Sequence, residues 1–344
     1  MTLIGCDLHA RMQQVAVLDT GTGEIQEHQF PHHGDVVERF YAALPPPVTV
    51  AVESTGYALW FHTLIRQLGH TLIVGDAAKI RAMVVRKTKT DRRDALHLLE
   101  LLRHDRLPTI WVPDPATRDR RALLAHRMRL VRIRTTVKNG LHAIALSHRL
   151  VEGSKRLTKP RLAVLQGLSL APYTARRRDE SLELLHWLDE HIRQLDDQVA
   201  EAAASDPAAR RLLTHPGVGP VTALATIVVL GPVGRFPGSK EVASYVGLAP
   251  ALHASADTHH LGQITKQGNP FLRLVLVQAA SIAIRYDEDL HRFYMTLHRR
   301  RGHAKAKVAV ARKLLIRLFI MLRDGIDYDE FRRRGRQTSV IASA

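Results

Sequence analysis

Four carboxylates near the N-terminus have the residue types and the positions that metal-dependent chemistry requires. Asp7 in LIGCDLH and Glu53 in VAVESTGY each follow a short β-branched run, so we expect each to lie at or near the end of a strand. Asp91 and Asp94 in KTDRRDA are spaced so that both fall on one face of a helix. Acidic groups that converge from separate elements repel one another unless a cation lies among them. The pattern indicates phosphoryl transfer with divalent metal ions, which hold the attacking and leaving oxygens.

The elements that must position these carboxylates are predicted to form an α/β domain over residues 1–113. The segments LIGCDL, QQVAVLDT and GEIQEHQF alternate at strand period, and TGTG makes the turn between the last two. A helix (DVVERFYAAL) then precedes a strand (VTVAVES), and a second helix (WFHTLIRQLG) precedes another strand (HTLIVGD). The helix that carries Asp91 and Asp94 continues through ALHLLELLRH. This order predicts a mixed sheet flanked by helices, in which Asp7 and Glu53 are neighbours if the first and fourth strands pair.

The middle of the chain, residues 114–206, is predicted to be a helical or coiled-coil region. Apolar residues recur there at spacings of three and four in a heptad-like seam, comprising Leu182, Leu185, Leu188, Ile192, Leu195 and Val199. The seam has two interpretations: a helical hairpin that packs on itself, or a coiled-coil arm used in assembly.

Residues 207–330 are predicted to form a second, mostly helical domain. The segment LLTHPGVGPVTALATIVVLG indicates two helices joined by Pro216 to Gly219, the signature of a helix-hairpin-helix. Gly217 and Gly219 would let backbone N–H groups approach a phosphate at a helix N-terminus, although a glycine-rich connection can also be only a tight turn. The remaining residues, 331–344, are basic and are predicted to be a disordered tail.

The charge of the chain favours a polyanionic partner. Lysine and arginine number 50 against 33 acidic residues, which gives a formal net charge of +17 over 344 residues. The excess recurs in many segments, among them KIRAMVVRKTK, RMRLVRIRTTVK, HRRRGHAKAK and FRRRGR. Such a distribution is typical of nucleic-acid binding, and its alternative is a basic but inert surface. Lys266 and Arg273 are candidates to line a nucleic-acid channel. In the alternative interpretation they belong to an amphipathic region in which the basic side chains extend to place their charged ends in solvent.

Cysteine content and hydropathy exclude several classes of protein. A single cysteine, Cys6, excludes an internal disulfide and a cysteine-based zinc site. We find no signal peptide at the start of the chain, and the longest apolar stretch, VTALATIVVLGPV, is too short to span a bilayer. The sequence therefore predicts a cytoplasmic protein that does not associate with membranes.

Several sequence blocks, taken in order, resemble the DEDD transposases of bacterial insertion sequences (insertion-sequence family 110), a group described as RNA-guided bridge recombinases. The N-terminal blocks are GCDLH, ESTGY and KTDRRDA. The C-terminal blocks are HPGVGPVTA, FPGSKEVASYVGLAP and ITKQGNPFLRLVLVQAA. They cover both ends of the chain and leave only the helical middle without a match.

The resemblance implies an α/β ribonuclease-H-like (RuvC-like) domain, similar to Holliday-junction resolvases, that holds Mg²⁺ with Asp7, Glu53, Asp91 and Asp94. It also implies a C-terminal transposase domain with a nucleophilic serine shortly after a Gly-Leu-x-Pro segment. In GLAPALHASADTHHLGQITK this serine is Ser255, followed by Ala256 where the family pattern has glycine. Ser239 and Ser244 are less suitable, since Ser239 has the sequence position of a helix N-cap before KEVASYVGL and Ser244 falls within that helix.

The function implied by the resemblance is transposition: DNA strands are cut and rejoined through a covalent phosphoserine intermediate. The implied partners are donor and target DNA, a non-coding guide RNA and further copies of the chain in a homo-oligomer. Two alternatives remain open from the residues alone. One is a metal-dependent, structure-specific nuclease like a junction resolvase, which uses water in place of serine. The other is a nucleic-acid-binding copy without activity.

Overall fold

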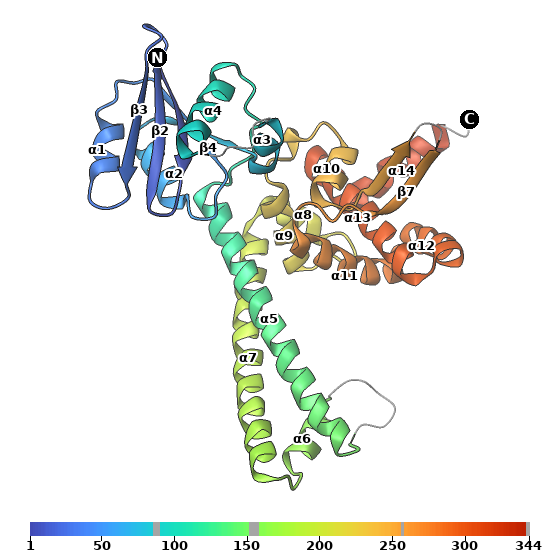
Figure 1. The fold of residues 1–344 in the computed structure, drawn as a ribbon. Coiled ribbons are helices and arrows are strands. Elements are labelled where there is room, and N and C mark those ends of the chain that lie inside the picture. The colour runs from blue at the N-terminus through green and yellow to red at the C-terminus, as the bar shows by residue number, and fades with distance from the viewer. Residues whose placement is uncertain (85–89, 151–157, 256–257, 342–344) are drawn as a thin grey trace. The chain divides into compact units, whose positions relative to one another are not determined.

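The chain folds into two compact units, Met1–Val112 and Pro113–Ala344 (Figure 1). The computed structural model describes residues 1–84, 90–150, 158–255 and 258–341, without the side chains of residues 159, 252–261 and 336–341. Among the described residues, no helix is both long enough and apolar enough to cross a membrane.

The N-terminal unit is built on a five-stranded sheet of order β3-β2-β1-β4-β5. β1 pairs antiparallel with β2, which pairs antiparallel with β3, whereas β1, β4 and β5 are parallel to one another. The predicted mixed sheet and the pairing of the first and fourth strands are therefore confirmed. The strands are β1 (Thr2–Leu8), β2 (Met12–Asp19), β3 (Ile25–Pro31), β4 (Val48–Glu53) and β5 (Thr71–Gly75).

Helices cover both faces of this sheet. On one face, α1 (Val36–Ala42) and α2 (Leu59–Gln67) bury Tyr41, Phe61 and Ile65 against alternate residues of β1 and β4. On the other face, α4 (Asp91–Arg103) packs Ala95 and Leu99 against β1 and β2. A short helix, α3 (Ala77–Met83), packs Ile80 on the side of α4. Each face thus has its own apolar core, as the period-two alternation of the strands requires.

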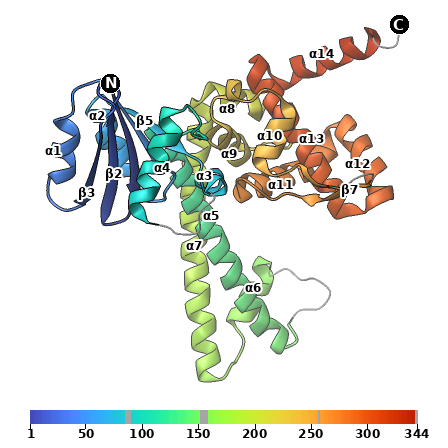
Figure 2. The same ribbon diagram turned by 45° about the horizontal axis from the view of Figure 1, so that its top comes forward.

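The second unit begins with a helical hairpin. α5 (Pro115–Ser147) and α7 (Pro172–Ser205) lie side by side (Figure 2). The short α6 (Lys159–Gln166) lies near the end of α5 and the first turns of α7. Arg127 pairs with Asp196 and Arg134 with Asp189, a register that makes the two helices antiparallel. Four residues of the predicted seam are buried in this contact: Leu185, Leu188, Ile192 and Val199. The seam therefore packs within the hairpin, and a role in assembly stays a prediction.

The rest of the second unit is mostly helical around one large apolar core. Its elements are α8 (Pro207–Leu213), α9 (Pro220–Leu230), a 3-10 turn (Val233–Arg235), α10 (Ser239–Val246), β6 (Pro250–Ser255), β7 (Thr258–Ile264), α11 (Pro270–Tyr286), α12 (Glu288–Arg301), α13 (His303–Asp324) and α14 (Tyr328–Ile341). The two helices predicted on either side of Pro216–Gly219 are confirmed as α8 and α9.

Two features of this unit differ from the sequence-based expectation. The segment predicted as a loop around the serine contains a two-stranded antiparallel hairpin, in which His253 is opposite His260. The tail predicted to be disordered continues α14 as far as Ile341. Glu330 forms ion pairs with Arg333 and Arg334, one turn further along the helix. Asp327 caps the helix, because its carboxylate accepts a hydrogen bond from the Glu330 amide. These local interactions favour a helix where net charge alone suggested a disordered chain.

Candidate metal centre

The first carboxylate of the site, Asp7, is placed by the alternation of β1. Ile4, Cys6 and Leu8 point into the core beneath α1 and α2, so Leu3 and Asp7 face α4. The Asp7 side chain is only 11% exposed. A carboxylate this buried requires compensation from hydrogen bonds, cations or both.

Glu53 lies beside Asp7 on the neighbouring strand. Val48, Val50 and Val52 belong to the core under α1 and α2, so Glu53 is on the α4 face of β4. Cys6 is opposite Val52 in the parallel pair, and one further step along both strands brings Asp7 level with Glu53. Because parallel strands end at the same edge of a sheet, both carboxylates are at the carboxyl edge.

The remaining two carboxylates are in the first turn of α4. Thr90 caps this helix by accepting from the Arg93 amide, and Asp91 and Asp94 then follow at the positively polarised end of the helix. Arg92 binds Glu27 of β3 through two hydrogen bonds of 2.5 and 2.7 Å. This pair holds the start of α4 against the sheet.

A histidine that the sequence reasoning missed connects two of these carboxylates. His9 Nε2 lies 3.1 Å from Asp7 Oδ2 and 3.4 Å from Asp91 Oδ1. The ring belongs to the β1–β2 turn, where the His9 amide donates to the Met12 carbonyl at 2.9 Å. The sequence gives only a weak signal for it, because His9 is two residues after Asp7 but lies past the end of β1, where strand parity does not fix the direction of a side chain.

The donor set fits a divalent cation. In the described part of the chain, Asp7, His9 and Asp91 form a group whose ligand atoms all lie within 4.8 Å of one another. Carboxylate oxygens suit Mg²⁺ or Mn²⁺, and an imidazole nitrogen is accepted more readily by Mn²⁺ or Zn²⁺. Of the four predicted ligands, Asp7 and Asp91 are in this group. Glu53 and Asp94 are outside this group. Glu53 is on β4, the strand next to that of Asp7, and Asp94 is in the same turn of α4 as Asp91.

The loop after Glu53 is fixed to the end of β1. The Ser54 amide donates to the Gly75 carbonyl at 3.1 Å, and the Tyr57 hydroxyl donates to the Leu8 carbonyl at 3.3 Å. The ESTGY segment therefore ties the backbone after Glu53 to the end of β5 and to the residue that follows Asp7 in β1.

The predicted serine is in the second unit, at the end of a strand. Ser255 is the last residue of β6, opposite Thr258 of β7, and its side chain is outside the described part of the structure. Ser244 lies within α10, as predicted. Ser239 was predicted as the N-cap of this helix, but that position belongs to Gly238 and Ser239 is the first helical residue.

The candidate phosphate-binding residues have structural roles of their own. Gly217 has a φ of +86°, and a Cβ atom there would lie 2.5 Å from the Ala283 nitrogen, so this glycine permits close packing on α11. Gly219 is the N-cap residue of α9. Lys266 is exposed beside the β-hairpin. Arg273 donates through Nη1 to the carbonyls of Val246 and Gln267, which ties the start of α11 to the end of α10.

Two models of transposase families match this chain. A model of DEDD transposases of the IS110 type matches residues 4–148, which include all four carboxylates and His9. A second model, described as the transposase IS116/IS110/IS902 family, matches residues 209–295. These family matches identify a DNA transposase.

Relatives match along most of the chain. It is 30% identical to the transposase for insertion sequence element IS1328 of Yersinia enterocolitica, over 77% of this chain and 82% of the relative. It is 28% identical to a probable family 20 transposase of Pseudomonas aeruginosa, over 83% and 85% of the two chains. It is also 27% identical to a pilin gene-inverting protein of Moraxella lacunata, over 71% and 69%. The chain belongs to the IS110 family of insertion-sequence transposases, as the sequence blocks predicted.

Proposed function

We propose that this transposase cuts and rejoins DNA with a carboxylate metal site in its N-terminal unit and the nucleophile Ser255 in its second unit. The observation that carries the proposal is the convergence of Asp7, His9 and Asp91 at the carboxyl edge of the sheet. We interpret the sheet with its two helical faces as a ribonuclease-H-like scaffold, in which acidic residues at strand ends and on a covering helix approach one phosphate.

Asp7 and Asp91 would hold a divalent cation, which we take to be Mg²⁺, with Glu53 and Asp94 completing an acidic surface around it. The bound cation supplies positive charge to the phosphate oxygens as negative charge develops there. His9 contacts both carboxylates, so its ring would orient them. Burial of Asp7 keeps its oxygens in one position and limits competition from water.

In the strand-transfer step, the Ser255 hydroxyl would attack the scissile phosphorus. The bond from Ser255 Oγ to phosphorus forms while the bond from phosphorus to the 3′ oxygen breaks, and the serine proton leaves to a base as the 3′ oxygen becomes a hydroxyl. A 3′-hydroxyl of another strand then attacks the phosphoserine and restores the serine hydroxyl. The number of phosphodiester bonds is conserved, so the exchange requires no external energy source.

The positive charge of the chain supports binding of DNA, and we further propose a non-coding guide RNA and a homo-oligomer as parts of the active assembly. Gly217 and Gly219 in the α8–α9 connection and Lys266 beside the hairpin would contact phosphates. Arg273 would act through the α10–α11 turn, since its guanidinium already donates to two carbonyls there. A nuclease that uses water is the second candidate, because the carboxylate group alone would support hydrolysis.

Metal-dependent cleavage tests the carboxylate site. The purified chain would be incubated with supercoiled plasmid carrying its element ends, with Mg²⁺ or Mn²⁺, as wild type, Asp7→Asn and Asp105→Asn. Asp105 is an exposed aspartate beyond α4 and serves as the matched control. We expect Asp7→Asn to lose at least about 100-fold in cleavage rate with DNA binding retained. Equal cleavage by Asp7→Asn and the wild type would contradict the proposed site.

A further inference from the structure

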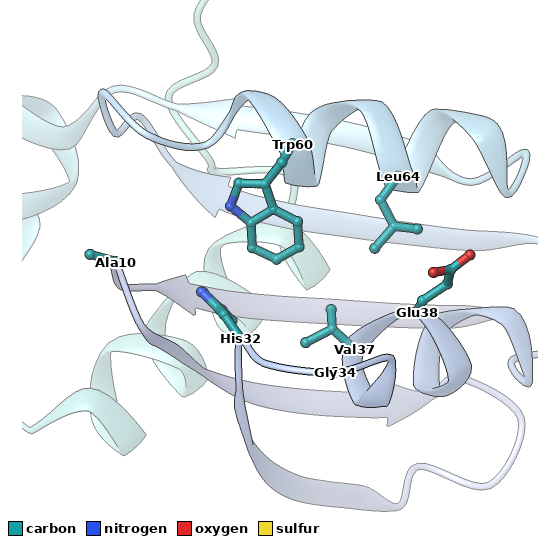
Figure 3. A pocket seen from close by; sticks show the side chains of 7 residues that line it. All are labelled: Ala10, His32, Gly34, Val37, Glu38, Trp60 and Leu64. Atoms are coloured by element: carbon teal, nitrogen blue, oxygen red, sulfur yellow. The ribbon is translucent and has the colours of Figure 1, made fainter.

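A pocket of about 460 Å³ opens in the N-terminal unit between α1 and α2 (Figure 3). Val37 and Glu38 come from α1, whereas Trp60 and Leu64 come from α2. The volume is within the range of pockets that take small organic groups. None of the residues assigned to the metal centre lines it.

The pocket and the carboxylates nevertheless share one edge of the sheet. β1 and β3 both run antiparallel to β2, so their carboxyl ends are at the same edge. Ala10, in the pocket wall, directly follows His9 of the metal centre, and the His32 amide donates to the Arg11 carbonyl at 2.8 Å. One short turn therefore presents His9 to the carboxylates and Ala10 to the pocket.

The walls suit a flat, unsaturated ring. Trp60 is 41% exposed, which is unusual for the largest apolar side chain. The His32 ring meets Trp60 edge-on, with centroids 4.8 Å apart and an interplanar angle of 69°. Val37 is nearly fully buried and, with Leu64, supplies an aliphatic wall. Aromatic faces of this kind stack on nucleobases with little regard to sequence.

The polar groups of the pocket exclude a phosphate and favour an uncharged ring that can donate hydrogen bonds. No lysine or arginine is among the lining residues, and Glu38 contributes a carboxylate that would repel an anion. Both His32 ring nitrogens are shielded from water, so His32 would contact a ligand through its ring carbons. Burial also lowers the pKa of His32, which keeps the ring uncharged. A carboxylate accepts from the amino group of cytosine or adenine.

We propose that this pocket binds an unstacked base of the DNA strand whose backbone lies at the carboxylates. The inference rests on the proposed function, because that function brings the strand to this edge of the sheet. A base held by Trp60, His32 and Glu38 would fix the register of the strand relative to Asp7, since the same turn connects the two sites. The chemistry favours a base with an exocyclic amino group.

The test compares strands with and without bases. The full chain in Ca²⁺ would be titrated with oligodeoxycytidylate of about sixteen nucleotides and with an abasic strand of equal length, which has the same phosphates. We expect Trp60→Ala to reduce the preference for the base-containing strand at least about fivefold. Leu59→Ala is the matched control, because Leu59 is 56% exposed on the same helix and is not among the lining residues. An unchanged preference in Trp60→Ala would overturn the proposal.

Two further measurements guard against a variant that misfolds. Glu38→Gln alters an exposed residue and should weaken binding of the cytidine strand more than that of a thymidine strand. Photocrosslinking of a 5-iododeoxycytidine strand to the wild-type chain should label the peptide that contains Trp60. A crosslink only outside the α1–α2 region would contradict the proposal.

Further outcomes distinguish a DNA ligand from an RNA ligand, and failure of the pocket proposal from failure of the metal-site proposal. A base preference seen only with oligocytidylate RNA would mean that the pocket serves RNA, and would overturn the assignment to DNA. If Asp7→Asn abolishes cleavage while Trp60→Ala leaves base preference intact, the pocket proposal fails and the metal site stands. If Asp7→Asn cleaves normally while Trp60→Ala loses base preference, the proposed metal site fails and the base-binding pocket stands.

Discussion

The backbone of Gly5 lies directly against the carbonyl oxygen of Ala95, where a Cβ atom at Gly5 would be only 2.2 Å from that oxygen. The same Cβ would lie 2.5 Å from the Leu99 nitrogen. α4 therefore packs on β1 at a position where the side chain can be no larger than the hydrogen atom of glycine. This contact precedes Asp7 by two residues and sets how closely Asp91 can approach it.

Gly5→Ala should disturb the metal centre without changing any of its ligands. The added methyl group would push α4 away from the sheet, since its nearest neighbours are backbone atoms that cannot rotate aside. We expect DNA cleavage to fall at least about tenfold and the free energy of unfolding to fall by about 1–3 kcal/mol. Cleavage assays and chemical denaturation measure the two effects. Gly56→Ala is the control, because nothing lies within 4 Å of a Cβ there; equal behaviour of the two variants would contradict this role of Gly5.

His9→Ala should weaken the metal centre through its carboxylates. The ring contacts Asp7 and Asp91 together, and loss of such a partner typically costs about 10–100-fold in metal affinity or activity. Titration of cleavage rate against Mn²⁺ and Mg²⁺ should show a higher half-saturating concentration in the variant. His33→Ala, at an exposed position after β3, should behave as the wild type. A half-saturating concentration unchanged by His9→Ala would exclude His9 from the site.

Acid should destabilise the second unit through His215. This ring is 1% exposed, donates from Nδ1 to the Pro216 carbonyl and packs against Tyr328, and burial lowers its pKa to about 4. The unfolded chain binds a proton near pH 6.5 whereas the folded chain does not. Stability conferred by the neutral ring is therefore complete above pH 6.5 and declines as the pH falls toward 4.

The expected decline between pH 7 and pH 4 is up to roughly 3 kcal/mol in the free energy of unfolding. His215→Phe removes the titrating group and retains an aromatic ring beside Tyr328, so its unfolding should depend less steeply on pH. Denaturation at several pH values provides the comparison, with His126→Phe on the exposed face of α5 as control. Parallel pH profiles for the wild type and His215→Phe would refute the assignment.

The faces of the N-terminal sheet on which the carboxylates lie were predictable because successive side chains of a strand point to opposite faces. Val48, Val50 and Val52 fill one core, so the place of Glu53 follows from its parity, and the place of Asp7 follows in the same way from Ile4, Cys6 and Leu8. The helical seam beginning at Leu182 was predictable for the analogous reason, since buried residues recur at helical spacing.

Other features depend on contacts that a linear pattern does not encode. His9 lies past the end of β1, where strand parity no longer assigns a direction with certainty, and only the position of Asp91 gives it a second partner. The β6–β7 hairpin is carried by backbone pairing, and its sequence contains no strong run of β-branched residues. α14 was missed because the charge of its arginines suggested disorder, whereas Glu330 pairs with two of them along the helix.

Covalent trapping tests most directly whether strand cleavage passes through Ser255. The chain would be incubated with Mg²⁺, its flanking non-coding RNA and labelled DNA that spans an element end, then denatured and separated by electrophoresis. We predict a DNA–protein adduct that requires Mg²⁺, persists in Ser244→Ala and disappears in Ser255→Ala. Cleaved DNA without an adduct would contradict the account and establish hydrolysis by water, and an adduct that survives in Ser255→Ala would place the nucleophile elsewhere.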